Sequence, residues 1–252
     1  MTTLADKLER SQDFLIGAEL VSTRGTVEEP RAAKTVAFAH ELAACSQVDW
    51  VSITDNAGGN PMLAAAALAA PFRDTDRSVI IHLSCKDFNR NGLESQAWHL
   101  ASEGLNNILV LTGDYSGTGV SGGSKPVFDI DSIGLLGLLG KMNGGLDVAQ
   151  PNAKKPTHLA PTQFYSGAVV TNFKLHENEV MPQLLKMEKK LEAGAKFLIN
   201  QIGYDSRKIH ELHAWMQQRG HGDVPLIGNV YVLSPGVAKV FNAQKIPGVV
   251  VS

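Results

Sequence analysis

Short apolar segments alternate with longer amphipathic segments along almost the whole chain, and this order constrains the fold most strongly. The apolar segments predict strands at Phe14–Leu20, Trp50–Thr54, Ser78–Leu83, Asn107–Thr112, Gly167–Asn172, Phe197–Ile202 and Pro225–Val232. The amphipathic segments predict helices at Pro30–Cys45, Pro61–Ala70, Gly92–Glu103, Ser132–Met142, Glu179–Ala193 and Ser206–Arg219. Alternating strands and helices build a parallel sheet, and strands that are apolar almost throughout are typical of a sheet covered on both faces.

Polar side chains gather where the predicted strands end: Glu19, Thr54–Asp55, His82, Asp114, Asn172 and Gln201. In a (β/α)8 barrel the loops after the strands converge on one cavity, which would bring such side chains together. A doubly wound open sheet binds ligands at a single switch point, usually after a glycine-rich turn, and no G-x-G-x-x-G or P-loop pattern follows any strand. We therefore predict an α/β fold of the TIM (β/α)8 type.

The predicted barrel is incomplete at its C-terminus. After Pro225–Val232 a short helical stretch, Ser234–Ala243, leads into Gly248–Val251, where the sequence stops without a clear eighth strand. Either the barrel is open or the sequence is a fragment. We predict a single barrel domain over residues 1–252.

Composition excludes several classes of function. The chain has 23 basic and 25 acidic side chains and no long run of like charges, so no electrostatic footprint for nucleic acid or an anionic membrane is present. Cys45 and Cys85 form no C-x-x-C pair, which indicates reduced thiols and no metal site. Met1–Gln12 lacks the apolar core of a signal peptide, and the apolar run Leu63–Ala70 is too short to cross a membrane. We expect a cytoplasmic protein.

Two connecting segments stand out. Ser116–Ser124 is rich in glycine and serine and directly follows Asp114, so it predicts either a mobile surface loop or a lid over the site. Gly144–Thr162 contains three prolines and predicts a long irregular connection.

Several residues have properties that suit chemistry. Glu19 ends an apolar strand, where desolvation would raise its pKa into the range of a general acid, although an exposed rim position is an equal alternative. Thr112–Asp114 combines a glycine, which allows close backbone approach, with a hydrogen-bond acceptor. His82 is either a hydrogen-bonded core residue or a ligand contact, and Gln201 has the paired donor and acceptor that suit the edge of a heterocycle.

The segment His82–Ser116 resembles the signature region of methylenetetrahydrofolate reductases. It contains a strand ending in His-Leu-Ser-Cys, an Asn-Arg-Asn before a helix, and a strand ending in Gly-Asp. The similarity extends more thinly over Phe14–Glu19, Val51–Gly58, Lys125–Ile133, Gly167–His176 and Lys189–Asp205.

This resemblance implies a flavoprotein that binds FAD at the strand ends and takes hydride from NAD(P)H. It would reduce 5,10-methylenetetrahydrofolate to 5-methyltetrahydrofolate, in one-carbon metabolism and methionine biosynthesis. The implied catalytic residues are Glu19, the acid that opens the methylene bridge, and Asp114; Gln201 joins them in holding the folate. The implied cofactor contacts are Thr54, His82, Thr112, Gly113, Asp114, Asn172, His176 and Lys190.

The departures from the family pattern fall mainly on the flavin side. Leu20-Val21-Ser22 replaces an aromatic residue and a Pro-Pro pair, Thr112 replaces an arginine, and Asn172 replaces a tyrosine. Gln183 and Lys186 replace an aspartate and an asparagine. An alternative function is therefore an FAD-free folate-binding barrel that acts as a carrier or assembly subunit; a pterin-binding one-carbon transferase is a third. We expect a homo-oligomer, because an unfinished barrel leaves strand edges open.

Overall fold

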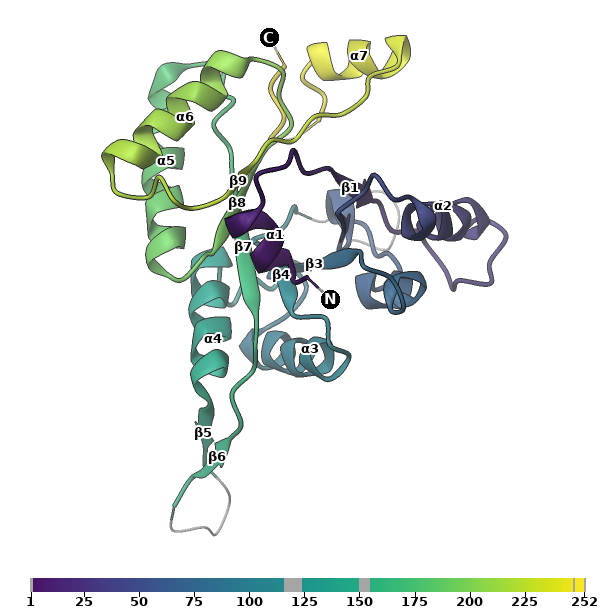
Figure 1. The fold of residues 1–252 in the computed structure, drawn as a ribbon, viewed down its shortest axis with the longest axis vertical. Coiled ribbons are helices and arrows are strands. Elements are labelled where there is room, and N and C mark those ends of the chain that lie inside the picture. The colour runs from purple at the N-terminus through teal and green to yellow at the C-terminus, as the bar shows by residue number, and fades with distance from the viewer. Residues whose placement is uncertain (1, 116–123, 150–154, 247, 252) are drawn as a thin grey trace. The chain divides into compact units, whose positions relative to one another are not determined.

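A computed structural model describes residues 2–115, 124–149, 155–246 and 248–251 (Figure 1). The chain divides into two compact units, residues 1–166 and residues 167–252. The segment predicted as a lid lies outside the described residues between 116 and 123.

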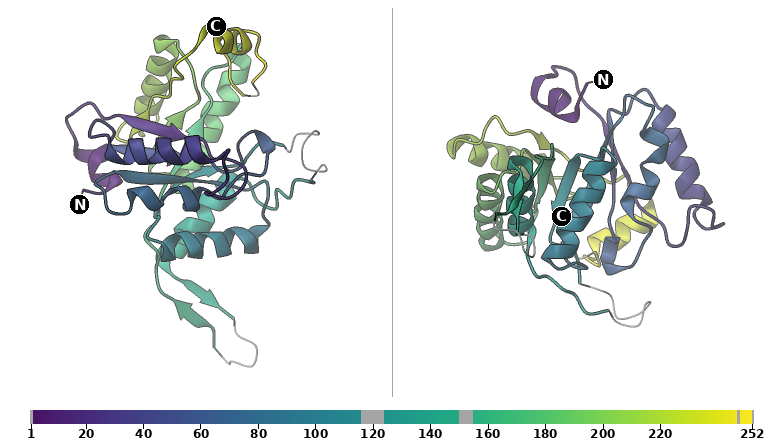
Figure 2. Two further views of the ribbon diagram at one scale, coloured as in Figure 1. Left: turned by 90° about the vertical axis from the view of Figure 1, so that its right-hand side faces the viewer. Right: turned by 90° about the horizontal axis from the view of Figure 1, so that it is seen from below.

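The first unit is built on four parallel strands in the order β1 (Gly17–Leu20), β2 (Trp50–Ile53), β3 (Ser78–Ser84) and β4 (Asn107–Leu111). Its longer helices are α2 (Ala33–Ala44), α3 (Arg90–Ser102) and α4 (Ser132–Gly144), with α2 against β1 and α4 against β4 (Figure 2). These elements match the predicted strands and helices to within a few residues, except at the start of β1.

The two faces of this four-stranded sheet differ in chemistry. Leu20, Ile53, Ile81 and Ile108 are aligned across the strands and are fully buried. Ile81 also lines a cavity together with residues of α3. Because side chains alternate along a strand, the residues between these positions point to the other face. That face carries Glu19, Ser52 and His82, and we call these three residues the polar face.

Three local features of the first unit differ from the sequence predictions. The range predicted as a helix, Pro61–Ala70, instead contains the short 3₁₀ turn η2 (Ala65–Leu68), with η1 (Ala57–Gly59) before it and η3 (Ala70–Phe72) at its end. Pro71 follows the predicted helix and lacks the amide donor that a helix continuing beyond Ala70 would need. The connection predicted to be irregular contains an antiparallel hairpin, β5 (Leu146–Val148) with β6 (Thr157–Leu159), which continues from the end of α4 (Figure 1).

A short N-terminal helix, α1 (Leu4–Arg10), is also present and was not predicted. The Thr3 hydroxyl accepts a hydrogen bond from the Asp6 amide, and the Asp6 carboxylate accepts one from the Thr3 amide. This capping box is visible in the sequence as Thr-x-x-Asp and was the signal that could have located the helix.

The second unit contains the remaining parallel strands, β7 (Tyr165–Val170, which begins at the end of the first unit), β8 (Phe197–Asn200) and β9 (Leu226–Ile227). Its helices are α5 (Glu177–Glu192), α6 (Ser206–Gln218) and α7 (Pro235–Asn242). All seven predicted strands are therefore present. The described residues hold no eighth parallel strand, so they form an α/β fold of the incomplete TIM type and not a full barrel.

Membrane-spanning helices and metal clusters are both absent from the part of the chain that the structure describes. No helix there has the length and apolar character needed to span a bilayer. Nor do three or more histidine, cysteine or acidic side chains cluster there in a way that would hold a metal ion. Cys45 is half-buried and Cys85 is buried, and both are free thiols.

Candidate functional site

The polar face of the first unit brings two predicted site residues close to one that was not predicted. Glu19 in β1 is the direct neighbour of Ser52 in β2. The Oγ of Ser52 lies 2.5 Å from Nε2 of His82 in β3. Ser52 pairs in register with Ile80, so His82 lies two residues further along β3 on the same face, and its ring reaches diagonally to the Ser52 hydroxyl.

His82 is a buried histidine whose surroundings disfavour its charged form. It is 7% exposed, and burial lowers the pKa of its imidazole to about 4. Ser52 beside it is also buried, at 6% exposure. At neutral pH the ring is therefore uncharged, with one nitrogen able to donate and the other able to accept a hydrogen bond.

Glu19 shows the shift expected from its sequence position. The Glu19 residue as a whole is exposed to solvent. Protein atoms around its carboxyl group nevertheless displace part of the water there, and this desolvation raises the pKa of Glu19. Both alternatives from the sequence therefore hold in part, because the side chain lies at an exposed rim and yet retains its proton more readily than a free glutamate.

A second group of polar residues connects the loops that follow β2 and β3. The Asp55 carboxylate accepts hydrogen bonds from the Ser84 amide at 3.0 Å and the Ser84 hydroxyl at 2.7 Å, and burial raises the pKa of Asp55. Lys86 has a side chain that is 3% exposed, and its Nζ lies 2.6 Å from the Asp87 carboxylate. Asn56 donates to the same carboxylate at 2.8 Å.

Gly113 packs directly on this network. A Cβ at position 113 would lie 2.9 Å from the Cγ and Cδ of Lys86, and Gly113 has a φ of +94°. Only glycine fits this close approach without strain. Asp114 follows it as an exposed residue, so the Thr112–Asp114 turn rests on the buried lysine.

Two other residues predicted to contact a cofactor in the first unit form hydrogen bonds within the protein. The Thr54 hydroxyl accepts a hydrogen bond from the Ser22 amide at 3.0 Å. The Thr112 hydroxyl donates to the Ser132 hydroxyl at 3.1 Å and accepts from the Ser132 amide at 3.3 Å. Thr112 thereby fixes the start of α4, which gives it a structural role.

The second unit contains the remaining candidates. Asn172 is buried, and its amide nitrogen donates to the Lys208 carbonyl at 3.0 Å, whereas its Oδ1 has no partner among the described residues. Lys190 in α5 donates to the Val169 carbonyl at 2.6 Å. His176 is exposed at the start of α5.

Gln201 follows β8 and keeps part of its amide available. Its Oε1 accepts from the Ile202 amide at 2.9 Å, and no hydrogen bond from its amide nitrogen occurs within the described residues. The amide nitrogen thus remains as a donor, whereas the oxygen is already bonded within the protein, so the paired donor and acceptor that the sequence predicts for a ligand are not both available.

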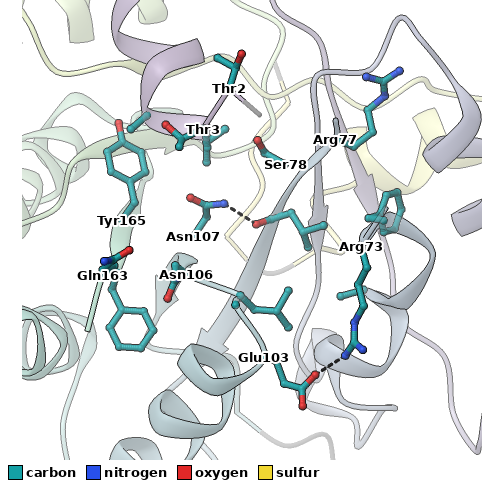
Figure 3. A pocket seen from close by; sticks show the side chains of 18 of the residues that line it. Thr2, Thr3, Arg73, Arg77, Ser78, Glu103, Asn106, Asn107, Gln163 and Tyr165 are labelled. Atoms are coloured by element: carbon teal, nitrogen blue, oxygen red, sulfur yellow. Dashed lines mark hydrogen bonds and ion pairs between the residues drawn. The ribbon is translucent and has the colours of Figure 1, made fainter. Parts of the chain in front are cut away.

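A cavity of about 690 Å³ lies at the other end of the strands, among residues of the first unit that precede β3 and β4. Figure 3 shows the amide side chains of Asn106, Asn107 and Gln163 along one side and the Arg73–Glu103 ion pair at another. None of its lining residues is a predicted site residue. A smaller cavity of about 240 Å³ lies at the carboxyl-terminal side and is lined by Asp55, His82 and residues of α3, among others.

Comparison with known proteins assigns the family. The family model described as methylenetetrahydrofolate reductase matches residues 4–145, which is more than half of the 252 residues. The chain belongs to the methylenetetrahydrofolate reductase family. The resemblance seen around His82–Ser116 is thereby confirmed. The match covers the strands that carry Glu19, Ser52 and His82 and the turn at Asp114.

Solved structures share the fold at low sequence identity. One is an uncharacterized protein from Clostridium thermocellum described as binding two copies of 5-methyl-5,6,7,8-tetrahydrofolic acid; it is 12% identical with a TM-score of 0.66 over 99% of this chain and 76% of that one. A 2,3-dimethylmalate lyase of the PEP mutase/isocitrate lyase superfamily is 12% identical with a TM-score of 0.54, over 97% and 86%. An oxaloacetate acetylhydrolase is 12% identical with a TM-score of 0.52, over 98% and 86%. Likeness at this level of identity supports the α/β fold alone.

Proposed function

We propose that this member of the methylenetetrahydrofolate reductase family binds a reduced folate and catalyses the reduction of 5,10-methylenetetrahydrofolate to 5-methyltetrahydrofolate, with NAD(P)H as the hydride source and FAD as the carrier. The observation that carries this proposal is the place of Glu19 on the polar face, beside Ser52 and within the family match, where desolvation raises the pKa of its carboxyl as suits a general acid. The folate bound by the protein from Clostridium thermocellum supports the substrate class.

The residues present offer hydrogen-bonding groups that fit the polar edge of a flavin. His82 has a ring nitrogen without a partner among the described residues, Asp114 is an exposed acceptor, and Gly113 allows close backbone approach. FAD bound through these groups would supply hydride transfer between the nicotinamide and the folate.

In this proposal four side chains have distinct roles in binding the folate and transferring a proton to it. Glu19 donates its proton to the nitrogen of the methylene bridge, so the bridge opens to an iminium that can accept hydride. Asp114 accepts hydrogen bonds from the pterin ring, and Gln201 donates its amide hydrogens to the folate. The uncharged state of His82 at neutral pH avoids placing a competing cation beside the acid.

The test measures NAD(P)H oxidation and folate reduction, the two half-reactions, separately. Glu19→Gln removes the proton donor, so we expect folate reduction to fall at least about a hundredfold while NAD(P)H oxidation by an artificial electron acceptor is kept, in line with the usual contribution of a general acid. Glu41→Gln is the matched control, because Glu41 is exposed on α2. Equal loss of both half-reactions in Glu19→Gln would show that Glu19 supports the structure and not the chemistry.

A second function, folate binding without FAD, is favoured by one observation. Thr112 and Lys190, two predicted cofactor contacts, already bond to Ser132 and to the Val169 carbonyl. The absorbance spectrum of the purified protein distinguishes the two functions. A flavin spectrum, present at purification or gained on adding FAD, supports the reductase, whereas its absence in both cases supports the FAD-free binding protein.

A further inference from the structure

The buried contact between Ser52 and His82 has no role in the reaction outlined above. Ser52 Oγ and His82 Nε2 are 2.5 Å apart, and the two residues are 6% and 7% exposed. They lie on neighbouring strands, so the backbone ladder of β2 and β3 holds both side chains at a fixed separation. A contact held in this way controls how the imidazole is oriented and protonated.

The direction of this hydrogen bond follows from what surrounds Ser52. A hydroxyl can either donate or accept, but its proton needs an acceptor when it is buried. Within the described residues His82 Nε2 is the hydrogen-bond partner of the Ser52 hydroxyl. Ser52 therefore donates its proton to Nε2. If Nε2 were protonated instead, the Ser52 proton would be buried without a partner.

This hydrogen bond also determines which nitrogen of the His82 ring carries the proton. Since the ring is neutral and Nε2 accepts, the single ring proton is on Nδ1. Nδ1 has no acceptor among the described residues, so an N–H donor remains for a ligand on the polar face.

We propose that Ser52 is a positioning residue that fixes His82 as the Nδ1–H tautomer, so that His82 donates a hydrogen bond to a ring acceptor of the bound ligand. The acceptor is a carbonyl oxygen or an imine nitrogen of a fused pyrimidine ring, which the pterin of a reduced folate and the isoalloxazine of a flavin both contain. The donor role rests on the proposed function, whereas the tautomer is a property of the protein without any ligand.

Nuclear magnetic resonance tests the tautomer directly. Long-range ¹H–¹⁵N correlation spectra of the ligand-free protein distinguish Nδ1–H from Nε2–H, and the His82 signals are assigned by their loss in His82→Gln. We expect wild type to show Nδ1–H. Ser52→Ala should show a mixture or the Nε2–H form, and Ser52→Cys, which keeps the side-chain volume, should fall between them.

Ser84→Ala is the matched control, because Ser84 is a buried serine of the same sheet whose hydroxyl bonds to Asp55 and not to His82. It should show the same tautomer as wild type. The Nε2–H form in wild type, or an unchanged tautomer in both Ser52 variants, would overturn the assignment.

Separate titrations with 5-methyltetrahydrofolate and with FAD show which ring takes the hydrogen bond. Loss of one neutral hydrogen bond predicts binding that is about three- to tenfold weaker in Ser52→Ala for the ligand that His82 contacts, with the other ligand unaffected. Unchanged affinity for both would overturn the donor role. If neither ligand binds wild type, the proposed function fails together with the donor role, and the spectra still decide the tautomer.

Discussion

Burial acts on Glu19 and His82 in opposite directions and with the same result. It raises the pKa of the Glu19 carboxyl and lowers the pKa of the His82 imidazole. In both cases the uncharged form is favoured, because taking a charge out of water is costly. The polar face thus combines an uncharged imidazole with a carboxyl group that holds its proton more readily than a free glutamate, which suits proton donation to a bound ring.

The lowered pKa of His82 predicts how stability depends on pH. Between pH 6.5 and about 4 the unfolded chain takes up a proton at this position, whereas the folded protein does not, so stability is lost as the pH falls. The shift corresponds to about 3 kcal/mol. We expect wild type to lose that much more unfolding free energy than His82→Gln between pH 7 and pH 4, measured by urea unfolding. Parallel losses in the two proteins would show that His82 is not shielded from water.

The sequence indicates the positions of single polar residues but not their hydrogen-bond partners. Glu19, His82 and Asp114 were identified from their positions at strand ends. Ser52 was missed because its contact with His82 depends on the pairing of two strands, which one sequence does not reveal. The same holds for the Asp55–Ser84 bond and the burial of Lys86.

At the scale of elements, periodicity located the parallel strands and their covering helices and failed where the pattern was short. The strands β5 and β6 have three residues each, too few to show alternation. The 3₁₀ turns were mistaken for a helix because an alanine-rich run has high helix propensity.

The position of β1 depends on a close contact that only glycine allows. A Cβ on Gly17 would lie 2.1 Å from the indole nitrogen of Trp50, a residue that is 5% exposed. Gly17→Ala should therefore destabilise the protein by about 1–3 kcal/mol through overpacking. Urea unfolding measures this change.

The control for this prediction is a glycine with open space around it. Gly140 lies exposed in α4, and a Cβ at this position would have no neighbouring atom within 4 Å. Gly140→Ala should stabilise the protein by about 1 kcal/mol because alanine favours the helix. A neutral Gly17→Ala would mean that Trp50 can move aside and that β1 is held less rigidly than the contact suggests.

At the scale of the whole molecule, the family assignment and the structure divide the chain differently. The family match ends at residue 145, inside the first unit, which contains Glu19, His82 and Asp114. Asn172, His176, Lys190 and Gln201 belong to the second unit. Their place in a common site stays a prediction, as do the single barrel domain and the homo-oligomer, because residue patterns indicate elements and not how units assemble.

The most direct test of the central claim is calorimetric titration of the protein with 5-methyltetrahydrofolate. We expect saturable binding by wild type and by Glu41→Gln. Glu19→Ala, which removes the whole carboxyl group, should bind about tenfold or more weakly, as expected for loss of a hydrogen bond to an ionisable group. Absence of binding by wild type, or equal binding by Glu19→Ala, would contradict the claim that the polar face receives a reduced folate.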